Sequence, residues 1–276
     1  MNVRKRYLPT GWYPKDQVST EAKIQTLAID VPKNKYNVVA AIVPHAGWEF
    51  SGNAAVHVFK SIKKIPETVV VVGGHLHASS GLYAAYEEAY ETPLGIINAD
   101  VELLKTLSDK IELKEDSVPD NTVEIQLPFI KYFFPEAKVL WLRAAPSAEA
   151  LELGKILWSL CQSLSRELLV IGSTDLTHYG LNYGFMPKGL GEKAVEWVKK
   201  ENDKHIIDAL ITLELNKALD YALDEHSSCS AGGAVAAANF AKASGIQEGK
   251  LLSYYTSWDI YPSDSFVGYA GIIYSR

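Results

Sequence analysis

The sequence predicts an α/β protein, a single-domain three-layer α/β/α sandwich with a mixed, largely parallel central sheet. Three short apolar runs, at residues 37–43, 67–72 and 167–171, are bounded by Gly, Pro or Ser, as expected of parallel strands buried on both faces. Segments with apolar residues at helical spacing alternate with these runs, which favours a sheet covered by helices on both sides. No Pro/Gly/Ser-rich linker or charge run divides the 276 residues, so we expect one domain over residues 1–276.

The remaining elements follow from their local patterns. We expect helices where apolar residues recur every three to four positions, and we expect Pro128 to interrupt one of them. The predicted helices cover residues 19–29, 51–64, 99–111, 122–134, 149–164 and 232–243, with two more within 189–223. The predicted strands, besides the three apolar runs, cover residues 138–143, 251–257 and 266–275.

Composition narrows the classes of function. The formal net charge of -6, the pI near 5.7 and the lack of a basic stripe argue against a nucleic-acid partner. The longest apolar stretches are too short to span a bilayer, so no membrane association is expected. The basic residues 4–6 are followed by Tyr-Leu-Pro, which is unlike the apolar core of a secretory signal. We therefore expect a cytoplasmic protein.

Potential metal ligands follow the apolar runs directly. His45 comes after the first run, His75 and His77 after the second, and Asp175 with His178 after the third. The carboxyl ends of neighbouring parallel strands meet at one edge of a sheet, so these side chains are expected to gather in one crevice. His45 is a good first ligand for Fe, Cu, Zn or Ni. On an extended segment His75 and His77 point the same way, and we favour His77 as the ligand, with His75 beside it or facing solvent.

Cys229 is the cysteine that we expect in the site. It lies in a polar segment just before the small-residue run 232–243, so its thiol is near a helix N-terminus that stabilises the thiolate. Its alternative role is a helix-start residue packed under a loop. Cys161 has apolar neighbours at helical spacing and is interpreted as a structural thiol. His226 is three residues before Cys229 but is not favoured as a site residue.

Asp175 and His178 are the candidates for proton chemistry. Their spacing of three lets them converge on one side of a turn or of a first helical turn. The pair suits a general acid or base with an orienting carboxylate, or a carboxylate ligand beside a catalytic imidazole. Asp175 can also simply cap a helix that begins there. His57 and His205 lie within predicted helices and are interpreted as structural or solvated.

The chain contains eight motifs that resemble those of the Memo-like proteins and occur in the same order as in that family. In prokaryotes these proteins are named AmmeMemoRadiSam system protein B. The resemblance runs from about residue 7 to the end of the chain. The motifs are GWYP (11–14), PHAGWEFSG (44–52), GGHLH (73–77), TPLG (92–95), NTVEIQLPF (121–129), STDLTHYG (173–180), HSSC (226–229) and VGYAG (267–271). This family resembles the class III extradiol dioxygenases in fold. Asn121 departs from the pattern, because it stands where a histidine is common in the family.

The resemblance implies a mononuclear metal site with His45, His77 and Cys229 as ligands. It also implies that Asp175 and His178 are the catalytic residues. Iron(II) is the first choice of metal, and copper or zinc are alternatives. An Fe(II)-dependent oxidoreductase or dioxygenase-like enzyme is the first functional hypothesis, with a small-molecule substrate, an aromatic compound among the options. The alternative is a non-enzymatic iron- or copper-binding or scaffold protein that docks a peptide in the crevice. A zinc hydrolase is a weaker third option. The resemblance also implies a pathway association with radical-SAM and AMMECR-type proteins.

Overall fold

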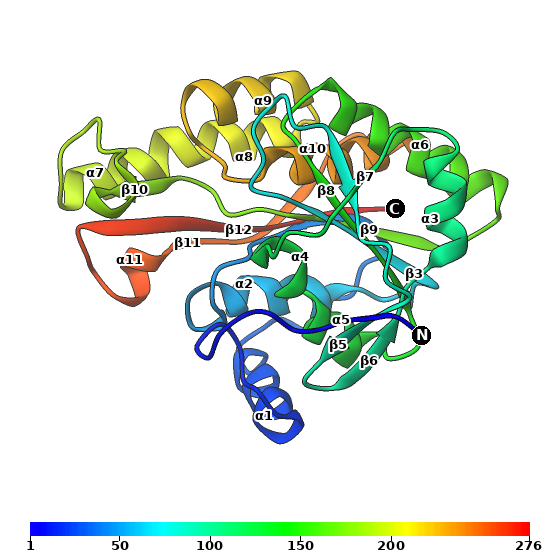
Figure 1. Ribbon diagram of the computed structural model, residues 1–276. Helices are drawn as coiled ribbons and strands as arrows, with labels where there is room; N and C mark the ends of the chain where they lie inside the picture. The colour runs from blue at the N-terminus through cyan, green and yellow to red at the C-terminus, as the bar shows by residue number, and fades with distance from the viewer.

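The computed structural model describes residues 1–276 and confirms the predicted α/β class. A nine-stranded mixed sheet forms the middle layer, in the order β10-β12-β2-β9-β3-β8-β4-β7, with β11 paired to β12 (Figure 1). Its strands are β2 (Val38–Val43), β3 (Thr68–Gly73), β4 (Leu82–Ala84), β7 (Lys114–Glu115), β8 (Lys138–Ala144), β9 (Leu168–Ser173), β10 (His178–Gly180), β11 (Lys250–Thr256) and β12 (Ser265–Ser275). A small second sheet consists of β1 (Val3–Arg4), β5 (Ala89–Thr92) and β6 (Gly95–Asn98).

The large sheet is parallel at its centre and in the edge pair β4–β7. The pairs β2–β9, β9–β3 and β3–β8 run parallel, whereas β12 and β4 join this centre antiparallel on its two sides. The three apolar runs of the sequence are β2, β3 and β9, and they are direct neighbours, with β9 between the other two. Their carboxyl ends therefore meet at one edge, as predicted.

Helices cover both faces of the sheet (Figure 1). One face carries α3 (Val101–Ser108), α6 (Ala148–Ser163), α8 (Asp203–Ile211), α9 (Leu215–Asp224) and α10 (Ala231–Ala243). The other face carries α1 (Gln17–Leu27), α2 (Trp48–Ser61), α4 (Asn121–Glu124) and α5 (Leu127–Phe133). The remaining helical segments are η1 (Leu181–Tyr183), α7 (Glu192–Trp197), the π-helical η2 (Val198–Asn202) and α11 (Ser257–Ile260).

Alternating side chains of the central strands fill two separate apolar cores. Ala40 and Ile42 of β2 face the core with α10, while Ala41 and Val43 face the core with α2. This alternation explains why the strands appear in the sequence as continuous apolar runs. Pro128 lies in the first turn of α5 and separates it from α4, as predicted.

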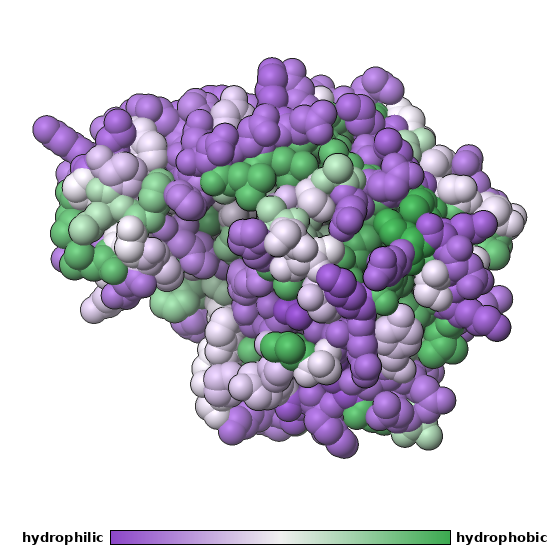
Figure 2. Space-filling view, turned by 45° about the horizontal axis from the view of Figure 1, so that its top comes forward, coloured by the Kyte–Doolittle hydropathy of each residue, from purple (hydrophilic) through white to green (hydrophobic).

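The molecular surface is mainly hydrophilic on the face shown in Figure 2. Apolar side chains also appear at the end of the molecule that carries α7 and β10, where Leu181, Met186 and Leu190 are exposed. None of the helices combines the length and the apolar content that a bilayer crossing requires.

Candidate metal centre

Three loops at the carboxyl edge of the sheet bring the candidate residues together. His45 follows β2, His75 follows β3, and Asp175 follows β9. Cys229 arrives from the helical layer, since it lies just before α10. The side chains of His45, His75 and Cys229 form one cluster in which a ligand atom from each lies within 4.8 Å of the others.

Two glycines allow α10 to bring Cys229 so close to the sheet. A Cβ atom on Gly232 would lie 2.1 Å from the carbonyl oxygen of Ala144, and one on Gly233 would lie 2.2 Å from that of Val72. Any side chain at these positions would therefore push the start of α10 away from the strands. The segment HSSCSAGG (226–233) thus supplies both the thiol and the two glycines that let it lie close to the histidines.

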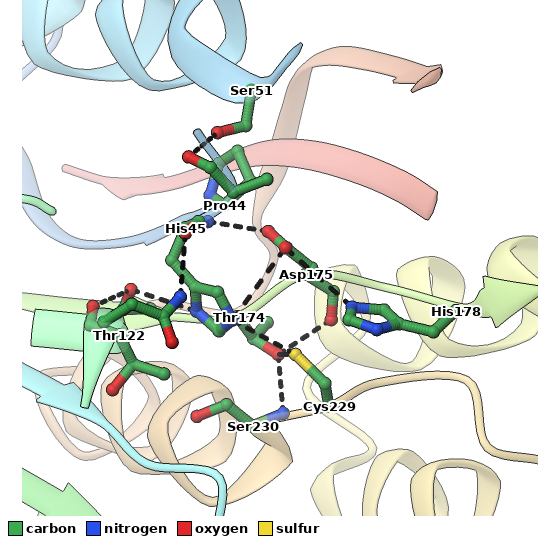
Figure 3. A network of polar contacts seen from close by, with 12 residues as sticks. Pro44, His45, Ser51, Thr122, Thr174, Asp175, His178, Cys229 and Ser230 are labelled. Atoms are coloured by element: carbon green, nitrogen blue, oxygen red, sulfur yellow. Dashed lines mark hydrogen bonds and ion pairs between the residues drawn. The ribbon is translucent and has the colours of Figure 1, made fainter. Parts of the chain in front are cut away.

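His45 is the centre of the cluster and is only 1% exposed. Its Nε2 lies 3.1 Å from His75 Nε2 and 3.2 Å from Cys229 Sγ. Its backbone N–H donates to Asp175 Oδ1 at 2.6 Å, and the Asn121 side-chain amide donates to its carbonyl oxygen at 3.1 Å. Figure 3 shows the sulfur of Cys229 directed at the imidazole of His45. Asn121 therefore supports the backbone of His45.

The spacing of these atoms fits one metal ion. Two imidazole nitrogens bound to one tetrahedral metal lie roughly 3.3 Å apart, and a nitrogen and a thiolate sulfur lie roughly 3.6 Å apart. The distances of 3.1 Å and 3.2 Å differ from these values by a few tenths of an ångström. Two imidazoles and one thiolate suit iron, copper or zinc, so the donor set does not select among them.

His75, and not His77, is the second histidine of the cluster, which reverses the preference drawn from the sequence. The side chain of His77 is exposed, and its Nδ1 lies 2.8 Å from the hydroxyl of Ser79. On an extended segment the two side chains would point the same way, but β3 ends at Gly73 and Gly74 has a φ of +118°. This left-handed turn breaks the alternation of side chains and directs His75 toward His45.

Asp175 and His178 lie next to the cluster, but no helix begins there. Residues 174–177 form an irregular loop that continues into β10, so the helix-capping interpretation of Asp175 is wrong. Asp175 Oδ2 lies 3.9 Å from His178 Nε2 and 3.9 Å from His45 Nε2. His178 Nε2 is buried and has no hydrogen-bond partner. The pair is thus brought together as expected, with a nitrogen left free.

The hydroxyl of Thr174 fixes Cys229 beside this loop. It accepts a hydrogen bond from the N–H of Ser230 at 3.0 Å and lies 2.7 Å from the hydroxyl of Ser228. The N–H of Cys229 also donates to the carbonyl oxygen of Asp175 at 3.2 Å. The thiol is therefore tied to the backbone that follows β9, as the contacts in Figure 3 show.

Neighbouring charges within the cluster shift the pKa values of its side chains. Burial alone would raise the pKa of the Cys229 thiol, but His45, His178 and His75 hold that pKa well below its usual value. Burial alone would lower the pKa of His75, but Asp120 and Cys229 raise it to about 10. The same opposition raises the pKa of His45 and of His178, because neighbouring negative charge outweighs burial. The histidines and the thiol therefore shift each other's pKa values in the directions that favour a thiolate on Cys229.

A cavity of about 370 Å³ opens onto the histidines. His45, His75, Asp175 and His178 line its polar side. The rest of its lining is mostly aromatic and hydroxylated, and includes Trp12, Phe50, Tyr183, Tyr261, Tyr269, Ser257, Ser263 and Ser265. A second cavity of about 350 Å³ reaches Cys229 and shares His178 and Tyr183 with the first.

Some aromatic residues close to the site in the sequence line the cavity, and others belong to the core. Trp48 is buried and stacks on Phe129 with ring centroids 4.0 Å apart, so it is a core residue. Trp258 packs against Phe266. The sequence did not indicate Tyr183, because it lies five residues after His178 in the short helical segment η1, whose three residues are too few to form a periodic pattern.

The Memo-like protein family model matches residues 4–273. A MEMO1 family protein of Thermococcus onnurineus is 30% identical, with 99% of this chain and 100% of the relative covered. A MEMO1 family protein of Pyrococcus abyssi is 32% identical, with 88% of this chain and 89% of the relative covered. The crystal structure of an uncharacterized Escherichia coli K12 protein shares the fold, with a TM-score of 0.54, 12% identity, and coverage of 85% of this chain and 98% of the other. The chain therefore belongs to the Memo-like family.

Proposed function

We propose that this protein is a mononuclear metal-dependent oxidoreductase, in which His45, His75 and Cys229 hold iron(II). The observation that carries the proposal is the convergence of two imidazole nitrogens and one thiol beside a cavity. Three protein ligands leave coordination positions open, as in catalytic sites rather than structural ones. Bound there, iron(II) would supply one-electron chemistry with dioxygen.

His178 is suited to move a proton at the edge of the cavity. Its Nε2 has no hydrogen-bond partner, and the carboxylate of Asp175 lies 3.9 Å away. The raised pKa of His178 keeps its imidazole protonated closer to neutral pH, because the charges of Cys229 and Asp175 outweigh burial. We therefore assign His178 the role of a general acid that donates from Nε2, with Asp175 stabilising its charged form.

The walls of the cavity favour a small planar substrate with hydroxyl groups. Trp12, Phe50 and Tyr261 offer flat apolar surface, and Ser257, Ser263 and Ser265 offer hydroxyls for polar contacts. A volume of about 370 Å³ is at the lower end of the range of ligand pockets. An aromatic compound of one or two rings fits this description better than a peptide.

Metal handling without turnover is the second candidate. A thiolate with two imidazoles is a soft donor set that also suits copper. Cys229 lines the second cavity and not the first, whereas His45 and His75 line only the first, so the cysteine is reached from a different side. Such access from a separate side favours transfer of a metal ion over binding of an organic substrate.

Anaerobic loading with iron(II) followed by oxygen electrode measurements tests the proposal. We expect one iron per chain and oxygen uptake that depends on a phenolic or catecholic compound. Cys229→Ser should lose the iron, whereas His178→Gln should keep the iron and lose the uptake. His205→Gln, on the exposed surface of α8, is the matched control and should behave as wild type. One iron per chain without oxygen uptake, whichever phenolic or catecholic compound is added, would favour metal handling without turnover. Absence of bound metal would refute both candidate functions.

A further inference from the structure

A row of buried charged side chains leads from His75 away from the cavity. His75 Nδ1 lies 3.5 Å from Asp120 Oδ2, and the same oxygen lies 3.1 Å from Arg143 Nη1. Arg143 Nη2 lies 2.9 Å from Asp116 Oδ1. The side chains of Asp120, Arg143 and Asp116 are at most 6% exposed. Buried charges of this kind persist only when each is paired, so the row has a defined geometry.

Asp120 has one carboxylate oxygen for the backbone and one for His75. It is the N-cap of α4, where Oδ1 accepts hydrogen bonds from the N–H of Thr122 at 2.8 Å and from the hydroxyl of Thr122. Oδ2 is then left for His75 and Arg143. The carboxylate therefore cannot turn away from His75 without losing its cap.

Besides Asp120, a second buried carboxylate holds the guanidinium of Arg143. It lies on β8, paired with Gly73 of the neighbouring β3. Its partner Asp116 is fully buried, and Asp116 Oδ2 accepts a hydrogen bond from Trp141 Nε1 at 2.8 Å. The guanidinium thus bridges two immobilised carboxylates, a task for which its planar fork is suited.

His75 needs such support more than His45 does. The side chain of His75 is 40% exposed, whereas that of His45 is 1% exposed. Packing fixes the ring of His45, but an imidazole that is two-fifths exposed and follows a left-handed glycine keeps several rotamers unless a polar contact selects one. Asp120 provides the contact to Nδ1, at the ring position opposite the nitrogen that faces the cluster.

We propose that Asp120 and Arg143 are positioning residues that orient His75 for metal binding, an inference that rests on the proposed metal centre. Asp120 accepts the proton of His75 Nδ1, which leaves the lone pair of Nε2 for the metal. Arg143 holds the Asp120 carboxylate in place. Contacts of this type behind a metal-bound histidine are commonly worth a factor of about 10 to 100 in metal affinity.

Asp120→Asn tests the assignment, because asparagine preserves the size and the capping ability of the side chain. Its amide N–H₂ would face His75 Nδ1 as a donor and would favour the tautomer with the proton on Nε2. Asp100→Asn is the matched control. Asp100 is also a buried N-cap, bonded to the N–H of Leu103 at 3.0 Å and to Arg166 at 2.7 Å, but it meets the first residue of β3, at the end away from the site.

The measurement is the dissociation constant for cobalt(II), followed by its thiolate charge-transfer band, together with thermal unfolding of each metal-free chain. We expect Asp120→Asn to bind cobalt about 10 to 100 times more weakly than wild type, and Asp100→Asn to match wild type. Arg143→Lys, which keeps the charge but loses the fork, should weaken binding in the same direction and serves if Asp120→Asn does not fold.

The outcomes separate this inference from the function that it rests on. Equal cobalt affinity in wild type, Asp120→Asn and Arg143→Lys would overturn the positioning role and leave the metal centre intact. An equal loss in Asp100→Asn would show that global destabilisation, and not orientation of His75, weakens binding, which also overturns the role. Wild-type protein that binds no cobalt would overturn the metal centre and this inference together.

Discussion

Replacing His75 and His77 one at a time distinguishes the ligand chosen by geometry from the one favoured by sequence spacing. His75→Ala removes a nitrogen that lies 3.1 Å from His45 Nε2. His77→Ala removes an exposed imidazole whose polar contacts are with Ser79. Both changes delete the same atoms from the same loop, so each variant controls for the other.

The expected loss of metal affinity in His75→Ala follows from the number of protein ligands. Zinc bound by four protein ligands has apparent binding free energies of about 10–16 kcal/mol, or roughly 2.5–4 kcal/mol for each ligand. His75→Ala should therefore raise the dissociation constant by about two to three orders of magnitude. His77→Ala should leave the constant unchanged within about threefold, since the contacts of His77 are confined to its own loop.

Competition between the protein and a chromogenic chelator for zinc(II) or iron(II) measures both constants. Circular dichroism of the metal-free variants shows whether either change unfolds the chain. A large loss in His77→Ala with near-normal binding in His75→Ala would refute the geometric assignment. Near-normal binding in both variants would show that the second imidazole contributes little to the site.

Two further predictions concern the carboxylate beneath the Asp175–His178 loop. Burial raises the pKa of Asp203 to about 6, although Thr177 and Tyr254 donate hydrogen bonds to it. An acid with a raised pKa in the folded state loses stability as pH rises, so the unfolding free energy should fall by roughly 2 kcal/mol from pH 4 to pH 6 in wild type and stay flatter in Asp203→Asn, as urea titrations at several pH values would reveal. Gly268→Ala would place a Cβ 2.0 Å from Asp203 Oδ2 and should cost about 1–3 kcal/mol of stability. Gly47→Ala, whose nearest atom would be 3.4 Å away, should change the same urea midpoint only slightly, and equal midpoints for both alanine variants would contradict the steric argument.

The fold was predictable because its core strands are buried on both faces. The runs that became β2, β3 and β9 contain almost only aliphatic residues, and their boundaries were predicted to within two residues. The short strands β4, β5, β6 and β10 were not predicted. Each has at most four residues, which is too short for a periodic pattern to distinguish it from a loop.

The choice between His75 and His77 was not predictable from spacing, because the backbone conformation of one glycine decides it. A glycine adopts positive and negative φ with similar ease, so Gly74 carries no sign of which way the chain turns. The sequence did contain a relevant observation, the pair Gly73-Gly74 directly after an apolar run. A pair of glycines at a strand end argues against continued extension and weakens any argument from alternation.

Asp120 and Arg143 were missed for a different reason. Their significance depends on pairing between β3 and β8, which are separated by more than sixty residues in the sequence. An arginine within an otherwise apolar strand is nevertheless a signal, because arginine is rarely buried without a charged partner. Arg143 ends the apolar segment of β8 and is 5% exposed, so a buried acidic partner had to exist.

Asp175 has a structural role that limits what its substitution can reveal about chemistry. Its carboxylate accepts the N–H of His45, and its carbonyl oxygen accepts the N–H of Cys229. The side-chain bond would be lost in Asp175→Ala, so His45 would move and metal binding would weaken whether or not Asp175 takes part in proton transfer. His178 has no such bond at Nε2 and lies between the two cavities. Proton chemistry at this site is therefore better tested at His178 than at Asp175, even though the two residues form one pair.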